Sequence, residues 1–269
     1  MTLQLLICTF NDGIHDIPHL LLPPLEDVSY LVSWQQSSDY SPCELPHSLL
    51  RPDVQVEPLA GLGLSRNRNN CLKYASGDIC LICDDDCRYT PQGLAHVVEV
   101  FETDSTLDLA TFKAKNDFEP RFYPDFSFDL RKKVKNYSPI SFEIAFRRTS
   151  IVGKLQFNEH FGLGADLFGA GEENLFVDDA MRLGLQCHYF PQVIVEHPGP
   201  TTCTSRIASP AVLRANGALI YRLYRPTMLL RAPLLAWRLN RQFRVPLFFG
   251  LKHIAVGIYK MFRLSCNSH

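Results

Sequence analysis

The last 69 positions of the sequence contain no acidic residue. Residues 201–269 hold 11 Lys and Arg, whereas residues 1–200 hold all 28 Asp and Glu and the other 16 basic residues. The net charge of −1 therefore hides an acidic segment of charge −12 and a basic segment of charge +11. A segment with one sign of charge favours a partner of the opposite sign, so we expect an anionic partner for residues 201–269.

Long apolar runs and a basic N-terminal leader are also missing. No uninterrupted run approaches the roughly 18 residues of a membrane-spanning helix. Met1 and Thr2 lead directly into an apolar segment, so we expect no signal peptide. No internal repeat is visible. The 269 residues suffice for one large α/β domain with a small appendage, and we expect the protein in the cytoplasm.

The nine cysteines lack the spacing of a disulfide framework or a zinc site. Cys80 and Cys83 have CxxC spacing and Cys87 lies close by, but the residues between the first two are apolar. No second CxxC or His pair follows at zinc spacing. We expect buried, reduced cysteines, as is typical of a reducing compartment.

Apolar runs alternate with helical patterns along the first 115 residues. This alternation predicts an α/β fold with a mostly parallel central sheet flanked by helices. We expect strands at residues 3–10, 28–34, 53–57, 79–83, 107–113, 141–147 and 186–195. We expect helices at residues 64–75, 91–102 and 173–184. Ser65 and Thr90 are the predicted N-caps of the first two helices, because their hydroxyls accept backbone N–H groups.

Two segments depart from this alternation. Residues 114–139 are polar and aromatic and predict a long excursion or lid. From residue 205 the chain predicts two or three basic amphipathic helices, broken at Pro226, Pro233 and Pro246. Arginines interleaved with Leu, Trp, Tyr and Phe favour an anionic membrane surface, with docking of the arginines on the acidic core as the alternative. Nucleic acid is not an expected partner.

Three consecutive carboxylates, Asp84, Asp85 and Asp86, follow the apolar run at residues 79–83. Ligands of open parallel sheets bind beyond the carboxyl ends of the strands. Three carboxylates at such an end repel one another unless a cation joins them. Mg²⁺ and Mn²⁺ prefer oxygen ligands and bridge to phosphates, so the motif predicts a divalent-cation site. A solvated acidic turn is the alternative.

The residues just before this motif, 63–78, read GLSRNRNNCLKYASGD. The block resembles the family 2 glycosyltransferases, which have a GT-A fold. In that family a Ser-x-x-Arg-Asn helix leads through a Gly-Asp turn into a strand ending in Asp-x-Asp. Arg68 and Asn69 match the Arg-Asn pair, and Asp84 and Asp86 match the Asp-x-Asp. The resemblance implies that Arg68 and Asn69 lie near the donor nucleotide.

The resemblance also implies roles for residues at the ends of the first, second and fourth expected strands. Asp84 and Asp85 would contact the donor, near its ribose, and Asp86 would be the direct ligand of Mn²⁺ or Mg²⁺. Thr9 matches the donor-site position at the end of the first strand. The family usually carries a base-reading Asp after the second strand. Here Gln35 or Gln36 stands near that place, or Asp39 after a shift, so the identity of the nucleotide base stays open.

A further acidic pair opens the helix expected at residues 173–184. The run FGAGEEN at residues 168–174 looks like the Gly-Gly-Glu-Asp motif of inverting GT-A enzymes. On that match Glu172 grips the acceptor hydroxyls and Glu173 is the general base; ordinary helix-dipole partners are the alternative. Several GT-A enzymes place a His after the last core strand as an additional metal ligand, which implies that role for His197. A structural His is the alternative there.

The resemblance implies a metal-dependent glycosyltransferase that moves a sugar from a nucleoside-diphosphate sugar, expected to be a UDP-sugar. The expected acceptor is a saccharide or lipid-linked saccharide in bacterial surface glycan synthesis, with inversion. Residues 1–204 would form the catalytic domain, with the donor half at 1–115 and the acceptor half at 116–204. Residues 205–269 would hold it on the cytoplasmic face of a membrane. The alternatives are a sugar-nucleotide nucleotidyltransferase and a catalytically dead, membrane-associated scaffold.

Overall fold

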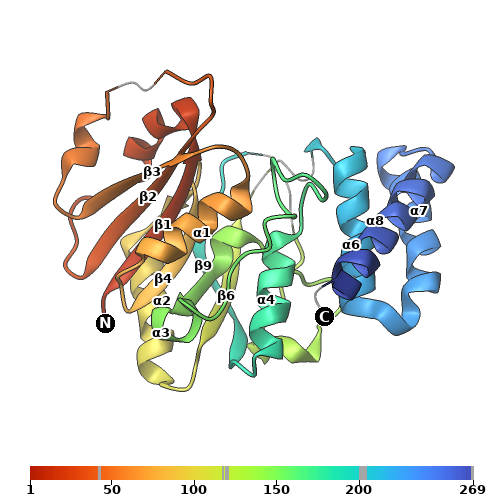
Figure 1. Ribbon diagram of the computed structural model, residues 1–269. Helices are drawn as coiled ribbons and strands as arrows, with labels where there is room; N and C mark the ends of the chain where they lie inside the picture. The colour runs from red at the N-terminus through yellow and green to blue at the C-terminus, as the bar shows by residue number, and fades with distance from the viewer. Residues whose placement is uncertain (42–43, 117, 119–120, 200–204, 268–269) are drawn as a thin grey trace.

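The computed structural model describes residues 1–41, 44–116, 118, 121–199 and 205–267 (Figure 1). Its sheet has the strand order β3-β2-β1-β4-β8-β6-β9-β5, and β7 pairs with β9. The strands are β1 Leu3–Phe10, β2 Val28–Gln36, β3 Val54–Ala60, β4 Ile79–Asp84, β5 Arg88–Tyr89, β6 Leu109–Lys115, β7 Phe128–Asp129, β8 Ile144–Arg147 and β9 Cys187–Glu196. The helices are α1 Leu64–Tyr74, α2 Pro91–Thr103, α3 Arg148–Ile151, α4 Glu172–Arg182, α6 Pro210–Tyr224, α7 Met228–Phe243 and α8 Leu247–Asn267.

Most long strands of the sheet run parallel. β1 pairs in parallel with β2 and β4, β2 with β3, and β6 with β9. The exception among the longer pairings is β8, which lies between β4 and β6 and is antiparallel to both. The predicted α/β fold with a mostly parallel sheet is therefore confirmed. The strand expected at 141–147 is shorter than predicted, because residues 141–143 form a 3₁₀ turn instead.

Side chains of β1 alternate between the two faces of the sheet and bury both. Leu5 belongs to the core cluster that includes Val97 of α2. Its neighbour Leu6 belongs to the cluster that includes Leu72 of α1 and Phe176 of α4. Helices α1 and α4 thus cover one face of the sheet and α2 covers the other. Since both faces are packed, the strand positions are fixed and their carboxyl ends form a defined edge.

The two predicted helix caps have different outcomes. Thr90 caps α2 as expected, since its Oγ1 accepts from the Gly93 N–H at 3.0 Å. The prediction for Ser65 is wrong. Helix α1 begins at Leu64, and its N-cap is Gly63, two residues before Ser65; the Gly63 φ of 116° lies in the region that favours glycine. Ser65 is then already inside the helix, and its hydroxyl donates to the Phe161 carbonyl at 2.6 Å.

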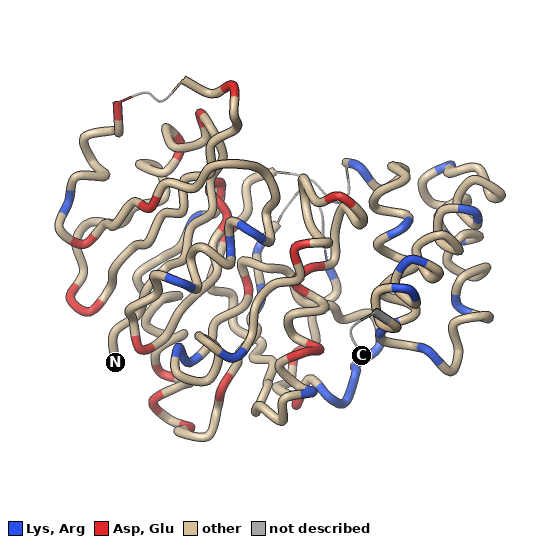
Figure 2. Tube along the Cα trace, viewed as in Figure 1, with Lys and Arg blue, Asp and Glu red and all other residues tan. Residues whose placement is uncertain are grey.

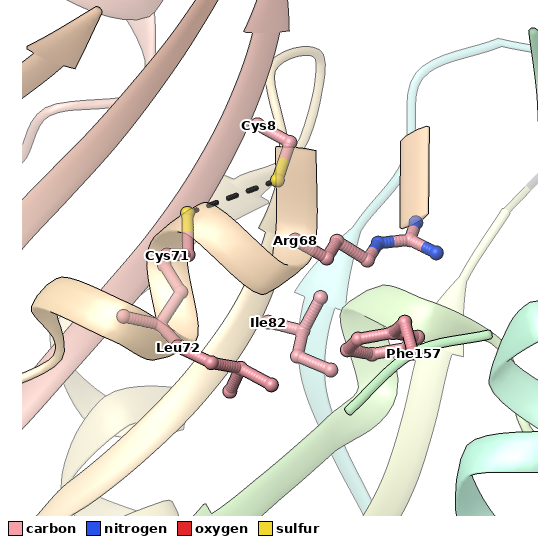
Figure 3. Close-up of a pocket in the computed structure, with 7 residues that line it drawn as sticks. Cys8, Arg68, Cys71, Leu72, Ile82 and Phe157 are labelled. Atoms are coloured by element: carbon pink, nitrogen blue, oxygen red, sulfur yellow. Dashed lines mark hydrogen bonds between the residues drawn. The ribbon is translucent and has the colours of Figure 1, made fainter. Parts of the chain in front are cut away.

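The cysteines in the described part of the chain are free, and those of the CxxC-spaced group are buried. Burial raises the pKa of Cys80 to about 12, so its thiol stays protonated. Cys8 and Cys71 lie with their Sγ atoms 3.8 Å apart in an apolar layer between α1 and the sheet, beside Arg68 (Figure 3). Within the described residues no His, Cys, Asp and Glu side chains form a group of three or more that could hold a metal. The expected burial of these cysteines is confirmed.

The segment predicted as an excursion folds back on the sheet. Within residues 121–139, β7 pairs with β9, and the Phe128 ring lies 5.0 Å from that of Tyr189. The Tyr123 hydroxyl donates to the carboxylate of Glu143, which is fully buried. Burial raises the pKa of Glu143 to about 7, against the lowering effects of Arg121 and of the Tyr123 hydrogen bond.

Helices α6, α7 and α8 follow the sheet domain in residues 205–267, in agreement with the predicted two or three basic helices. In Figure 1, α8 lies between α6 and α7, and α7 is the outermost. Helix α6 packs on the sheet domain in a cluster that includes Phe161 and Leu175. The predicted domain boundary at 204 falls in residues 200–204, outside the described residues. No helix in the described part is both long and apolar enough to cross a membrane.

Two of the three predicted proline breaks are present. Pro226 lies in a 3₁₀ turn between α6 and α7, and Pro246 lies in the turn between α7 and α8. The break predicted at Pro233 is wrong, because this proline lies inside α7. A proline inside a helix removes one i→i−4 hydrogen bond. Packing of the opposite side of α7 against α8 offsets that loss, since Ala232 and Ala236 are buried there.

Candidate active site

The carboxyl ends of β1 and β4 meet at one edge of the sheet and open into a cavity of about 570 Å³. The parallel register pairs Cys8 with Asp84, so the residues that follow each strand emerge side by side. A cavity of this size suits a small-molecule ligand. Nine of the ten predicted site residues line it, namely Thr9, Gln35, Arg68, Asp84, Asp85, Asp86, Glu172, Glu173 and His197.

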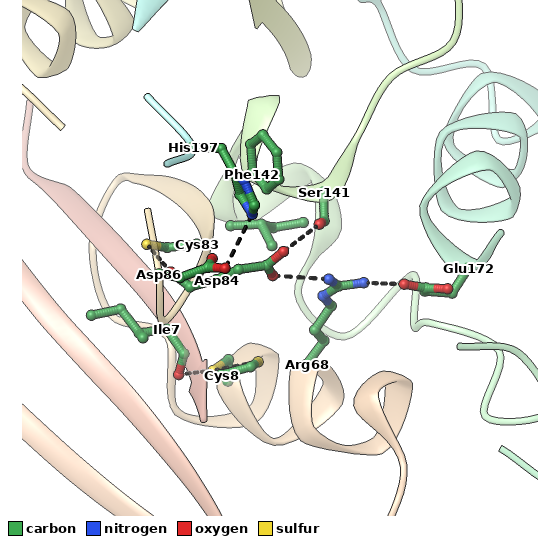
Figure 4. Close-up of polar contacts among 12 residues, drawn as sticks. Ile7, Cys8, Arg68, Cys83, Asp84, Asp86, Ser141, Phe142, Glu172 and His197 are labelled. Atoms are coloured by element: carbon green, nitrogen blue, oxygen red, sulfur yellow. Dashed lines mark hydrogen bonds and ion pairs between the residues drawn. The ribbon is translucent and has the colours of Figure 1, made fainter. Parts of the chain in front are cut away.

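The three consecutive aspartates have three different environments, and Figure 4 shows the contacts of Asp84 and Asp86. Asp84 accepts from Arg68 Nη2 at 3.1 Å and from Ser141 Oγ at 3.3 Å. Asp85 accepts from Thr9 Oγ1 at 2.7 Å. Burial raises the pKa of Asp85 to about 6, and the charges of its two acidic neighbours act in the same direction against the Thr9 hydrogen bond. The negative charge at this edge is therefore spread unevenly.

Asp86 points to His197, with Oδ2 3.1 Å from Nε2. The His197 side chain is only 5% exposed, whereas that of Asp86 is 55% exposed. The opposite ring nitrogen, Nδ1, donates to the Gly199 carbonyl at 2.8 Å, and the Phe142 ring stacks on the imidazole at 5.1 Å. The hydrogen bond to Asp86 raises the pKa of His197. Ring orientation is thus fixed by Gly199 and Phe142, and Nε2 is presented to Asp86.

The Asp86–His197 pair fits a divalent cation. Neighbouring ligands about 2.1 Å from Mg²⁺ in an octahedral shell lie roughly 3 Å apart, and the two ligand atoms here are 3.1 Å apart. An Nδ1–H bonded to a carbonyl leaves Nε2 as the metal-binding nitrogen, a common arrangement of metal-ligating histidines. Mg²⁺ sites also typically use only one or two protein ligands and complete the shell with phosphate and water.

Arg68 connects the aspartates to the second acidic pair. Its guanidinium is 3% exposed and binds Asp84 through Nη2 and Glu172 through Nη1, the latter at 2.6 Å. Burial alone would lower the pKa of Arg68, but the charges of these two carboxylates more than offset it and raise the pKa. The cation also lies 5.5 Å from the Phe157 ring centroid. Arg68 therefore bridges residues from two distant parts of the sequence.

The second acidic pair starts α4. Gly171, with a φ of 86°, precedes the helix, and Glu172 and Glu173 are its first residues. Glu173 Oε1 accepts from Asn174 Nδ2 at 3.0 Å, and the Asn174 Oδ1 accepts from Ser138 at 2.7 Å. Burial and the nearby Glu172 charge raise the pKa of Glu173. A carboxyl whose pKa approaches neutrality suits proton transfer at neutral pH.

Gln35 has an unsatisfied amide at the cavity. The residue is 3% exposed, and its Nε2 has no hydrogen-bond partner among the described residues. An unpaired buried donor is costly, typically about 1–3 kcal/mol. Such a group in a ligand cavity is explained when a ligand acceptor pairs with it.

The structure does not bring Asn69 into the cavity. Its side chain forms two hydrogen bonds with the Phe157 backbone: Nδ2 donates to the carbonyl at 2.9 Å, and Oδ1 accepts from the N–H at 2.7 Å. Asn67, two residues earlier on α1, lines the cavity instead and donates to the Thr9 carbonyl at 3.0 Å. The helical period separates the two asparagines by about 200°, so position in the motif alone could not distinguish them without the orientation of α1.

Sequence reasoning also missed three other residues that line the cavity. Ser141 and Phe142 come from the 3₁₀ turn before β8 and contact Asp84 and His197 respectively. Arg206 comes from the segment before α6. The positive charge of that segment was visible in the sequence, but nothing in its pattern distinguished Arg206 from the ten other basic residues of 201–269.

The comparisons with known proteins agree with this geometry. The Glycosyl transferase family 2 model matches residues 33–156, which include Arg68 and the three aspartates. The structure of S. aureus TarS 1–349 with UDP-GlcNAc has a TM-score of 0.56 at 17% identity, over 91% of this chain and 73% of that one. The mannosyltransferase PcManGT from Pyrobaculum calidifontis with GDP-Man and Mn²⁺ has a TM-score of 0.54 at 14% identity, over 96% and 74%.

No curated protein matches the chain in sequence. At 14–17% identity the two structures establish the fold, and the family model adds a likeness to glycosyltransferases over residues 33–156. The chain therefore has a GT-A fold, and its residues 33–156 resemble the family 2 glycosyltransferases.

Proposed function

We propose that the protein transfers a sugar from a nucleoside-diphosphate sugar, with a UDP-sugar as the expected donor, to a hydroxyl of a saccharide or lipid-linked saccharide, with inversion. The main support is that the aspartates at 84–86 and the pair Glu172–Glu173 come from distant parts of the chain, meet in one cavity and are joined by Arg68. The aspartates suit a metal-bound diphosphate, and the glutamate pair suits an acceptor. Two relatives in fold carry nucleotide sugars in their structures.

The donor lies along the edge formed by β1, β2 and β4 in this proposal. Gln35 donates its unpaired Nε2 hydrogen to the nucleotide base, and Asp84 and Asp85 accept from the ribose hydroxyls or Thr9. A base carbonyl would satisfy the Gln35 donor, and uracil and guanine both carry one. Arg206 supplies positive charge to the diphosphate, since it lines the cavity from outside the sheet.

Asp86 and His197 hold the divalent cation, Mn²⁺ or Mg²⁺, in this proposal. Such a cation stabilises the charge that develops on the departing diphosphate. The neighbouring Asp85, whose pKa is raised, donates or accepts a hydrogen bond according to its protonation and adds less negative charge than a free aspartate. The PcManGT structure contains Mn²⁺.

Glu173 acts as the general base and Glu172 orients the acceptor. The Glu173 carboxylate takes the proton of the acceptor hydroxyl, whose oxygen then bonds to the anomeric carbon. The bond between that carbon and the diphosphate oxygen breaks on the opposite side, and its electron pair leaves with the nucleoside diphosphate. Asn174 and Ser138 hold the Glu173 carboxylate in position.

The two rival functions have less support. A nucleotidyltransferase would require a Gly-rich basic loop directly after the first strand, but β1 leads into the turn Asn11–His15, which contains no Lys or Arg. A catalytically dead scaffold would have no reason to keep the aspartates at 84–86 and the glutamates at 172–173 in one cavity around a buried arginine. Both rivals make distinct predictions in the experiment below.

A screen of sugar nucleotides tests the proposal. The purified chain is mixed with UDP-, GDP- and dTDP-sugars, with Mn²⁺ or with EDTA, and both thermal stabilisation and release of the nucleoside diphosphate are measured. We expect one donor to stabilise the protein and to be hydrolysed slowly in Mn²⁺. Pyrophosphate release from a nucleoside triphosphate would support the nucleotidyltransferase, and binding without turnover would support the scaffold. Retention of the anomeric configuration, observed by NMR, would contradict inversion.

A further inference from the structure

The outward side of α7 carries an apolar stripe. Leu230, Leu234 and Trp237 lie at helical positions i, i+4 and i+7 and are 75%, 45% and 50% exposed. The opposite side of the helix, with Ala236 and Leu239, is buried against α8. An amphipathic helix of a water-soluble protein normally presents polar residues outward. Helix α7 therefore has two apolar sides, of which one is covered within this chain.

Arginines flank the stripe. Arg231 and Arg238 are exposed beside it, and the Arg241 guanidinium lies 5.6 Å from the Trp237 ring centroid. In the Cα trace of Figure 2, basic positions and no acidic ones are marked along α6, α7 and α8. The local charge is therefore positive around an exposed apolar strip, the combination expected of a helix that lies in the interface of a membrane.

The start of α8 also exposes large apolar side chains. Phe248, next to the turn that ends α7, is 85% exposed, and Leu247 is 41% exposed. Together, Leu230, Leu234, Trp237, Leu247 and Phe248 with the flanking arginines are called the α7–α8 face here. Large aromatic and leucine side chains at such exposure are costly in water, at roughly 25 cal/mol per Å² of apolar surface.

Other basic residues of these helices are used inside the protein. Arg222 binds Asp178 at 3.1 Å and also pairs with Asp179, both on α4. Arg214 donates to the Leu167 carbonyl at 3.1 Å. Docking on the sheet domain thus explains why α6 carries Arg214 and Arg222. It does not account for α7, whose arginines make no ion pair with any carboxylate that the structure describes.

We propose that the α7–α8 face docks the enzyme on a membrane surface rich in anionic lipid. The leucines and aromatic rings enter the boundary between headgroups and acyl chains, and the arginines meet the lipid phosphates. A soluble polyanion would use the arginines but leave the apolar stripe in water. A second copy of the chain offers an acidic surface to the arginines, but this pairing does not explain what covers the apolar stripe. The proposal does not depend on the transfer reaction.

Vesicle sedimentation is the first test. The full chain is spun with vesicles of phosphatidylcholine alone and with vesicles that contain about 30 mol% phosphatidylglycerol, at low and at roughly physiological salt. We expect binding to the anionic vesicles, at least about tenfold weaker partition to the neutral ones, and weakening with salt. Equal binding to both compositions, or none to either, would overturn the proposal.

Tryptophan quenching shows whether the apolar stripe enters the lipid. The chain has two tryptophans, and Trp34 is 6% exposed in the core whereas Trp237 is half exposed on α7. Vesicles with brominated acyl chains should quench Trp237 and leave Trp34 unchanged. The variant Trp237→Phe should then show no quenching. Polyphosphate, a soluble polyanion, should bind the arginines without quenching Trp237. If anionic vesicles with brominated chains do not quench Trp237, docking by this face is contradicted.

Variants locate the face. Arg231→Gln with Arg238→Gln, and separately Leu234→Ser with Trp237→Ser, should each reduce partition to anionic vesicles by about tenfold or more. The matched controls are Lys132→Gln and Leu50→Ser, which are exposed elsewhere on the protein and should bind as wild type. The arginine pair keeps the test valid if the apolar pair folds poorly. Loss of self-association in the ultracentrifuge, with vesicle binding unchanged, would assign the face to a second copy instead.

Discussion

The candidate active-site cavity and the C-terminal helices both concentrate charge, and they differ in where the residues of opposite charge lie. In the cavity, Arg68 is buried between two carboxylates at 2.6 Å and 3.1 Å, one from β4 and one from α4. On α7, exposed arginines surround an apolar stripe and have no described carboxylate partner. A cluster of like charges therefore forms an internal site where the fold packs a distant segment of opposite charge against it. Where no described segment of opposite charge packs against it, the cluster forms part of the outer surface.

Removing the buried cation should have the largest effect. Arg68→Ala leaves Glu172 and Asp84 without their shared partner, and breaking one side of a buried ion pair costs about 3–5 kcal/mol of unfolding free energy. Donor binding and turnover should be lost with it. Chemical denaturation and a turnover assay measure both effects. Arg66→Ala, an exposed position on the same helix, is the control and should cost less than about 0.5 kcal/mol.

Removing the proposed base should affect the rate and leave the fold intact. Glu173→Gln is expected to lower kcat by about 10²–10⁴ with unchanged thermal stability, because it removes proton transfer and keeps the shape. In the wild type, burial raises the pKa of Glu173, so the rate should rise with pH through a value above the usual glutamate range. The variant should lack this limb. A variant with wild-type kcat would remove Glu173 from the proposed mechanism.

Glu143 is a third case, a buried carboxyl that forms no ion pair with a described basic residue. Its pKa is raised from 4.5 to about 7, mainly by burial, so folding favours its protonated form. The unfolding free energy should therefore fall as pH rises from about 4.5 to 7, by about 3 kcal/mol from this group, and then level off. Glu143→Gln should remove that component of the pH dependence. Glu26→Gln, an exposed position, should leave it unchanged.

The smallest effects should separate the two kinds of arginine in the C-terminal helices. Arg222→Gln removes the ion pairs to α4 and should cost about 1–2 kcal/mol of unfolding free energy. Arg238→Gln, on the outward side of α7, should cost less than about 0.5 kcal/mol. Urea denaturation of both variants measures the difference. Equal costs would mean that α7 packs against an internal partner and would weaken the distinction drawn here.

Local patterns predicted the parts of the fold that depend on neighbours in sequence. Apolar periodicity, with Gly and Pro at the ends of elements, predicted both the strand that ends in Asp84 and the helix that carries Arg68. The mostly parallel sheet follows from their alternation. The antiparallel direction of β8 was not predicted, because it depends on pairing with β4 and β6, which lie far away in the sequence.

Site residues were predictable where a motif carried them and unpredictable where three-dimensional packing chose them. The acidic residues at 84–86 and 172–173 stand out in the sequence, yet the bridge by Arg68 between them does not. Asn69 was predicted at the donor, but the orientation of α1 turns Asn67 to the cavity and Asn69 to the Phe157 backbone. The failed break at Pro233 has the same origin, since packing against α8 outweighs a local preference.

Direct titration of nucleoside diphosphate tests the central claim, that this cavity binds a metal-bound nucleotide. UDP and GDP are titrated calorimetrically into the wild type, Asp86→Ala and Glu26→Ala, with Mn²⁺ and then with EDTA. The account predicts that one nucleotide binds the wild type and Glu26→Ala only with Mn²⁺, and that Asp86→Ala weakens this binding by about tenfold or more. Binding that is equally tight in EDTA and in Asp86→Ala, or no binding of either nucleotide, would contradict it.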